Sequence, residues 1–297
     1  MTPLRKRMIE DLQIRNRSAG TIRIYVSHVA HFARHFGRSP EELGPEETRQ
    51  YQLHLLARKV SWSNFNQVVC ALRFLYGTTL GRPEDVLRIS YGRRPKKLPV
   101  VLSRDEVMEL LACITNRKHR MVLTTMYATG MRLAEALALS INDIDSRQMS
   151  ILVARGKGNK QRLVPLSHKL LQELRLWWRQ YRSPRWMFPG SRPDRPLGCS
   201  AVGRSWKRAV KRVGLRKPAG THSLRHTFAT ELLEAGIDLP TIQRILGHAS
   251  LGTTAKYTHV RRDHLQATCR VLDLLPLEKL RTAGHPPEGH QRRKSAK

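Results

Sequence analysis

The chain has 297 residues, of which 40% are hydrophobic, so its length allows two packed domains and its composition predicts a globular protein. Lysine and arginine total 54 against 23 acidic residues, which gives a net charge of +31 and a pI near 11.2. This charge predicts a polyanionic partner, with nucleic acid ahead of an anionic membrane, because no run approaches 18 apolar residues and no amphipathic helix gathers the basic residues on one face.

Four amphipathic segments fill the first 80 residues and predict a small helical bundle over residues 1–92. Ser18 is placed to cap the second segment, and Pro45 followed by two glutamates opens the third. The apolar positions recur at helical spacing in each segment: Leu4, Met8 and Leu12; Ile22, Tyr25, Val29, Phe32 and Phe36; Tyr51 and Leu55; Phe65, Val68, Leu72, Leu75 and Tyr76.

A basic linker separates this bundle from a second domain. Residues 93–101 contain two prolines and four basic residues, which disfavour regular structure. Ser103 and Glu106 then form a capping-box pattern that opens a domain over residues 102–275. The elements expected in it are a β pair over 149–154 and 160–166 and helices over 168–181, 201–213, 223–235 and 240–246. The predicted fold is mainly α with a small β element, and a polar, disordered tail is expected over 276–297.

The cysteines are far apart in the sequence, and none forms a CxxC pair, which argues against a zinc site or a dense disulfide framework. They are Cys70, Cys113, Cys199 and Cys269. The N-terminal residues carry charge where a secretory signal needs an apolar core. We therefore expect a cytoplasmic protein that works in a reducing compartment.

Several short blocks gather side chains that suit a phosphate group. HSLRH at 222–226 places an arginine three residues after a histidine, so both share one face of a helix. LGH at 246–248 and TTAKYTHV at 253–260 add a histidine and a tyrosine nine residues apart. Upstream, ATGMRLAEALAL at 128–139 and a Gly-Lys-Gly turn at 156–158 add an arginine, a glutamate and a lysine. The candidate residues are Arg132, Glu135, Lys157, His222, Arg225, His248 and Tyr257.

In this order the blocks resemble the tyrosine recombinase family, also called phage-type integrases, and the resemblance covers nearly the whole chain. It implies an N-terminal core-binding (SAM-like) bundle and a catalytic domain that together clamp double-stranded DNA. It also implies four protomers on two DNA sites, a 3′-phosphotyrosyl intermediate and a Holliday junction. No additional small domain precedes the bundle, so we expect the two-domain form without an arm-binding domain. The catalytic residues that the resemblance implies are Arg132, Lys157, His222, Arg225, His248 and Tyr257.

These residue types fit cleavage of a phosphodiester, whose anionic oxygens repel nucleophiles and whose alkoxide leaves poorly. Arg132 and Arg225 can each hold two non-bridging oxygens, and Lys157 can protonate the leaving 5′ oxygen. The two histidines can move a proton or hydrogen-bond the phosphoryl group, and Tyr257 is the expected nucleophile. We expect no metal or cofactor, because the acidic pair in SINDID at 140–145 is more simply explained as a turn. We also expect no ATP, because attack by the phenol conserves the bond energy in a phosphotyrosyl link.

Each of these residues also has a plainer explanation. In a chain this basic, an isolated arginine or lysine is usually solvated or contacts phosphate nonspecifically, while a lone histidine or tyrosine is usually structural. Their joint occurrence in one order favours the catalytic explanation. A type IB topoisomerase and a DNA-binding accessory protein without activity stay open as alternatives. Glu135 either supports Arg132 or forms an ion pair on a helix surface.

Residues 261–280 follow the tyrosine and contain leucine and valine positions that a lone helix would expose to water. We expect this segment to dock either onto its own domain or onto a neighbouring protomer of a tetramer. The target sequence stays open, and so do integration, chromosome dimer resolution, cassette capture and transposition, because base contacts and DNA deformability decide specificity.

Overall fold

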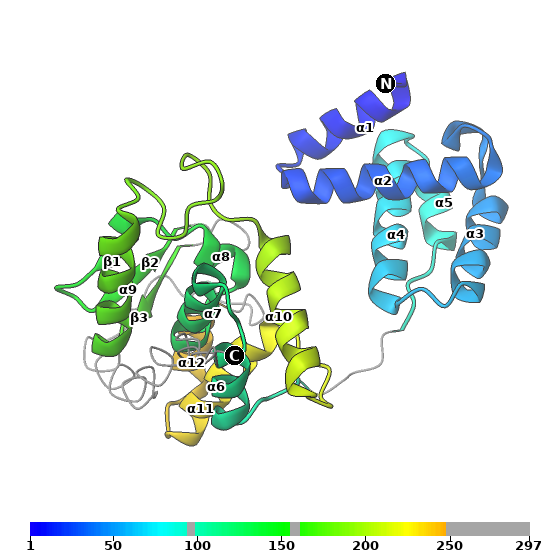
Figure 1. The fold of residues 1–297 in the computed structure, drawn as a ribbon. Coiled ribbons are helices and arrows are strands. Elements are labelled where there is room, and N and C mark those ends of the chain that lie inside the picture. The colour runs from blue at the N-terminus through cyan, green and yellow to red at the C-terminus, as the bar shows by residue number, and fades with distance from the viewer. Residues whose placement is uncertain (94–98, 155–160, 248–297) are drawn as a thin grey trace, which may run out of the picture. The chain divides into compact units, whose positions relative to one another are not determined.

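The computed structural model describes residues 1–93, 99–154 and 161–247 (Figure 1). The chain divides into two compact units, unit 1 over Met1–Lys97 and unit 2 over Leu98–Lys297. Most described residues are helical, and a small antiparallel sheet lies in unit 2. The predicted fold class, mainly α with a small β element, is therefore confirmed.

Unit 1 is a helical bundle in which the predicted apolar faces form the core. Leu12, Phe32 and Leu72 are fully buried, one from each of three helices. The Ser18 hydroxyl accepts the Thr21 N–H at 3.2 Å, so the predicted cap is present. The elements are α1 (Pro3–Ile14), α2 (Ala19–Phe36), η1 (Pro40–Glu42), α3 (Pro45–Ala57), α4 (Trp62–Phe74), η2 (Leu75–Thr79) and α5 (Pro83–Arg88).

Unit 2 opens at the predicted capping box, in which the Ser103 hydroxyl accepts the Glu106 N–H and the Glu106 carboxylate accepts the Ser103 N–H. Its sheet has the order β1-β2-β3, with Ile151 paired to Val164. The elements are α6 (Arg104–Ala112), α7 (Arg117–Thr129), α8 (Leu133–Leu137), η3 (Ile141–Asp143), β1 (Ile144–Asp145), β2 (Ser150–Val153), β3 (Arg162–Pro165), α9 (His168–Tyr181), α10 (Cys199–Val213), α11 (His222–Glu234) and α12 (Leu239–Leu246).

Helix α7 is the central element of unit 2 and packs against α6, α8, α10 and α11 (Figure 1). Its side chains Val122, Leu123 and Tyr127 are fully buried, because the helix is surrounded by other elements. The C-terminal end of α7 therefore lies inside unit 2, where it meets α8 and α11.

The predicted turn in SINDID is present, although part of it also pairs with the sheet. The Asp143 carboxylate accepts the Ser140 N–H, and the Asp145 carboxylate accepts the Arg147 N–H. The pair Ile144–Asp145 forms β1 and extends the predicted β pair to three strands. A two-residue strand is too short for alternation to reveal it in a sequence.

Within the described ranges, no helix is both long and apolar enough to span a bilayer. The same ranges contain no cluster of three histidine, cysteine or acidic side chains arranged to hold a metal ion. Most of the predicted linker and the whole of the predicted tail lie outside the described residues.

Candidate active site

The site begins where α7 ends at Gly130. Gly130 has a φ of +66°, a left-handed conformation that favours glycine. A Cβ at this position would lie 2.4 Å from Cδ1 of Phe228 and 2.8 Å from Cδ2 of Leu246. Glycine is therefore required both by the backbone turn and by the close approach of α11 and α12, and it directs the chain into Met131 and Arg132.

Arg132 and Glu135 lie at the start of α8 and are joined twice. The Arg132 N–H donates to Oε2 of Glu135 at 2.8 Å, and Nη1 of Arg132 donates to Oε1 at 2.7 Å. The Glu135 side chain is 3% exposed and that of Arg132 is 25% exposed. The alternative that Glu135 forms an ion pair on a helix surface is therefore wrong, since its carboxylate is buried beneath Arg132.

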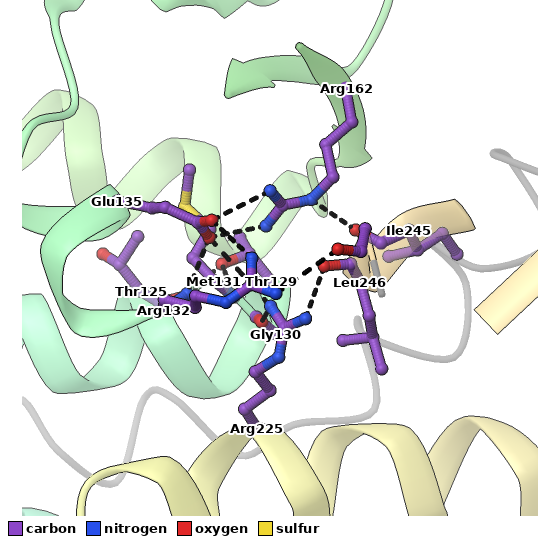
Figure 2. A network of polar contacts seen from close by, with 11 residues as sticks. Thr125, Thr129, Gly130, Met131, Arg132, Glu135, Arg162, Arg225, Ile245 and Leu246 are labelled. Atoms are coloured by element: carbon purple, nitrogen blue, oxygen red, sulfur yellow. Dashed lines mark hydrogen bonds and ion pairs between the residues drawn. The ribbon is translucent and has the colours of Figure 1, made fainter. Parts of the chain in front are cut away.

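A third charged residue, Arg162 at the start of β3, completes this pair and was missed by the sequence analysis. Its Nη1 and Nη2 donate to the two carboxylate oxygens of Glu135 at 3.0 and 2.6 Å (Figure 2). The signal was present in KQRLVPL, because alternation along the strand places Arg162 on the same face as the buried Val164, with the exposed Leu163 between them. A charged residue on the inward face of a strand needs a buried partner.

Arg225 reaches the same cluster from α11 and is 1% exposed. Its Nη1 donates to the carbonyl of Gly130 at 2.7 Å, its Nη2 donates to the carbonyl of Leu246, and Nη1 lies 4.0 Å from Oε2 of Glu135. The Nε–H of Arg225 is buried and finds no acceptor among the described residues. The structure thus brings the predicted residues Arg132 and Arg225 to one carboxylate (Figure 2).

The C-terminal end of α12 lies against the three guanidinium groups. α12 starts at an Asp238 cap and ends at Gly247, which has a φ of +63°. The last carbonyls of a helix have no partner within the helix and carry partial negative charge. Here the carbonyls of three consecutive residues each accept from a different arginine: Ile245 from Arg162, Leu246 from Arg225 and Gly247 from Arg132.

The cluster has a net positive charge, because three guanidinium groups surround one carboxylate. Burial raises the pKa of Glu135, but the hydrogen bonds from Arg162 and the Arg132 N–H outweigh burial and lower this pKa from 4.5 to about 2. Burial and the charges of Arg132 and Arg162 lower the pKa of Arg225 to about 9. Glu135 is therefore negatively charged and Arg225 positively charged at neutral pH.

His222 is the first residue of α11 and is exposed next to this cluster. Its ring packs edge to face on His226, with the ring centroids 4.7 Å apart. Partial burial, then His226 and the charges of Arg225 and Arg132, lower the pKa of His222 below its usual 6.5. The imidazole is therefore neutral at physiological pH and is able to accept a proton.

The remaining predicted site residues, Lys157, His248 and Tyr257, lie outside the described residues, as does segment 261–280. Two residues of the cluster lie close in the sequence to these undescribed ranges. Strand β3 begins two residues after the range 155–160, which contains Lys157, and Gly247 directly precedes His248 in the sequence.

Comparisons with known proteins agree over the two units. The chain matches the profile described as "Phage integrase family" over residues 100–264, and that described as "Phage integrase, N-terminal SAM-like domain" over residues 4–85. It is 46% identical to y4qK of Sinorhizobium fredii, which is named as an integrase/recombinase, over 97% of this chain and 92% of that protein. It is 34% identical to the tyrosine recombinase XerA of Pyrococcus horikoshii, over 86% of this chain and 88% of that protein.

A solved structure shares the fold. The crystal structure of the XerH site-specific recombinase bound to its difH substrate is similar with a TM-score of 0.62 and 27% identity. The similarity covers 85% of this chain and 79% of that one.

Proposed function

This chain belongs to the phage integrase family and is a tyrosine recombinase, and we propose that it cuts and rejoins double-stranded DNA through a 3′-phosphotyrosyl link to Tyr257. The observation that carries the proposal is the meeting of Arg132 and Arg225, from segments far apart in the sequence, around the buried Glu135. The XerH structure, which contains a DNA substrate of that recombinase, supports a duplex as the partner.

The arginines supply the charge that phosphoryl transfer needs. In the transition state, negative charge grows on the non-bridging oxygens, and fixed cations in a dry site stabilise it more strongly than water does. Arg132 is partly exposed and can turn a donor toward a phosphate. The Nε–H of Arg225 is a buried donor, and leaving such a group without an acceptor costs about 1–3 kcal/mol. A phosphate oxygen would satisfy it.

The other predicted residues move protons and form the new bond. The phenol of Tyr257 attacks the phosphorus, the 3′ oxygen stays bonded to it, and the 5′ oxygen leaves. Lys157 donates a proton to that 5′ oxygen, while His222 and His248 accept the phenolic proton or hydrogen-bond the phosphoryl group. A DNA hydroxyl reverses the reaction and releases the tyrosine, so neither ATP nor water is consumed.

The assembly follows from the reaction. Residues 1–92 form the core-binding half of a clamp, and residues 102–275 form its catalytic half. Exchange of strands between two duplexes needs four cleavages, so we propose a tetramer on two DNA sites that passes through a Holliday junction. Residues 261–280 would link neighbouring protomers.

Covalent capture of DNA tests the proposal. The probe is a nicked duplex selected from a random-sequence pool because it stays attached to the wild-type protein on a denaturing gel. Tyr257→Phe should bind this duplex normally but form no adduct, since only the phenolic oxygen is lost. The wild-type adduct should form equally in EDTA. Adduct formation by Tyr257→Phe would exclude Tyr257 as the nucleophile, and relaxation or binding without recombinant products would favour the topoisomerase or accessory-protein alternatives.

A further inference from the structure

Arg162 differs from its two neighbouring arginines in how it is held. It forms a two-pronged ion pair with Glu135, and its Nε donates to the carbonyl of Ile245 at 2.8 Å (Figure 2). Its side chain is 9% exposed. A guanidinium fixed by both edges in this way has little freedom to turn toward a ligand.

Arg132 and Arg225 are held more loosely by Glu135. Arg132 donates one side-chain bond to the carboxylate, and its second bond, to the Gly247 carbonyl, is long at 3.3 Å. Arg225 makes no hydrogen bond to Glu135, since the nearest atoms are 4.0 Å apart. Arg132 can therefore exchange a present partner for a phosphate oxygen, and Arg225 can offer one its Nε–H, which has no acceptor among the described residues.

Glu135 competes with a phosphate for the same two arginines. A buried carboxylate attracts every nearby cation, and this attraction is stronger in a protein interior than in water. Arg162 already occupies both carboxylate oxygens, so the pull of Glu135 on Arg132 and Arg225 is weakened. Without Arg162 the net charge of the cluster would fall from +2 to +1, and the carboxylate would hold the remaining arginines.

We propose that Arg162 is a positioning residue for the recombination reaction, an inference that rests on the proposed function. It neutralises Glu135 and thereby leaves Arg132 and Arg225 available to the scissile phosphate. It does not itself touch that phosphate.

The same side chain also fixes the end of α12 relative to the β2–β3 hairpin. Arg162 lies on β3, and its bond to Ile245 joins that strand to the last turn of α12. A Cβ on Gly247 would lie 2.8 Å from Cδ of Arg162, so only a glycine allows the end of α12 to approach this side chain so closely. Arg162 therefore sets the distance between the two segments that lead to Lys157 and His248.

A double-mutant cycle separates this role from a purely structural one. Wild type, Arg162→Ala, Glu135→Gln and the double variant Arg162→Ala/Glu135→Gln are compared. In the double variant the competing negative charge is also removed, while an oxygen remains to accept the Arg132 N–H. Arg244→Ala is the matched control, because Arg244 is an exposed cation of α12, the helix whose last turn Arg162 contacts. Each protein is mixed in excess over the selected nicked duplex described above. The single-turnover rate of adduct formation and the affinity for DNA are measured separately.

We expect Arg162→Ala to slow adduct formation about 100-fold, the scale of a small misplacement of catalytic groups, with DNA affinity close to that of wild type. The double variant should recover at least about tenfold of this loss, a scale typical of charged groups that compete at close range. Arg244→Ala should cleave at the wild-type rate. If removal of Arg162 prevents folding, Arg162→Lys and Arg162→Lys/Glu135→Gln are compared in the same way, since a lysine cannot reach both carboxylate oxygens and Ile245 at once.

A wild-type rate for Arg162→Ala overturns the inference. So does a double variant that is as slow as Arg162→Ala or slower, because a purely structural role predicts that the losses of the two single variants add. A wild-type protein that captures no duplex at all overturns the proposed function together with this inference. Wild-type capture with an unaffected Arg162 variant overturns the inference alone.

Discussion

Glu135→Gln tests how much the buried carboxylate stabilises unit 2. Glutamine keeps the shape of the side chain and an oxygen for the Arg132 N–H, but it removes the charge. Because the pKa of Glu135 is lowered from 4.5 to about 2, ionisation is favoured in the folded state by about 3 kcal/mol at neutral pH. The side chain is 3% exposed, so solvent screening reduces this value little. We expect the variant to lose about 3 kcal/mol of unfolding free energy at pH 7.

The pH dependence has a definite sign. A carboxyl group whose pKa is lower in the folded protein stabilises the fold above its unfolded pKa of 4.5 and loses this effect as the pH falls through about 2. The difference in stability between wild type and Glu135→Gln should therefore be constant above pH 4.5 and should shrink steadily below it.

Denaturant unfolding followed by tryptophan fluorescence measures this difference, since the buried Trp177 and Trp206 both lie in unit 2. Glu109→Gln is the matched control, because Glu109 is an exposed glutamate of α6 and its replacement should leave stability unchanged within about 0.5 kcal/mol. Equal stability of wild type and Glu135→Gln at pH 7 would refute the reasoning, and so would a difference that does not shrink in acid.

Two further predictions concern the backbone and the leaving group. Gly130→Ala should destabilise unit 2 by about 2 kcal/mol or more in a thermal melt, because a side chain at positive φ costs about 1–2 kcal/mol and Phe228 blocks the Cβ. The control is Gly203→Ala on α10, where no atom lies near the added Cβ, and it should be neutral or stabilising. Equal effects of the two substitutions would contradict the steric argument. Lys157→Ala should cleave slowly but recover when the leaving 5′ oxygen is replaced by sulfur, which needs no proton; rescue that is no greater than for wild type would remove the general-acid role from Lys157.

Local sequence signals predicted the helices and caps of the described structure well. The spacing of Leu4, Met8 and Leu12 reflects a buried helix face, and the Ser18 cap satisfies an N–H of the first turn, so each feature depends on residues close in sequence. The short helix α5 lacks such a signal, because it is too short for the apolar pattern to repeat. The pattern of the fourth segment extends to Leu75 and Tyr76, but it does not distinguish the π-helical turn η2 from a continued α-helix.

The candidate site was predicted in part. The motifs identified Arg132 and Arg225 by their resemblance to a family, but the partners of these residues depend on contacts between distant segments. The i,i+3 spacing left the role of Glu135 open, because burial under Arg162 is a tertiary property. The spacing of His222 and Arg225 predicted one shared helix face, but it could not show that His222 is exposed while Arg225 is buried, with its guanidinium bound to backbone carbonyls.

The cluster explains how a strongly basic chain can keep three arginines close together. Like charges this close repel one another, and Glu135 compensates only one of them. The end of α12 supplies the rest, because its three terminal carbonyls each accept from one arginine. A phosphodiester carries one negative charge, so its binding would lower the net charge of the cluster from +2 to +1. Both anions, the phosphate and Glu135, would then have arginine partners. The end of α12 therefore holds the arginines in place for a phosphate. Its neutral carbonyls are weaker acceptors than phosphate oxygens, so a phosphate can replace them as a partner.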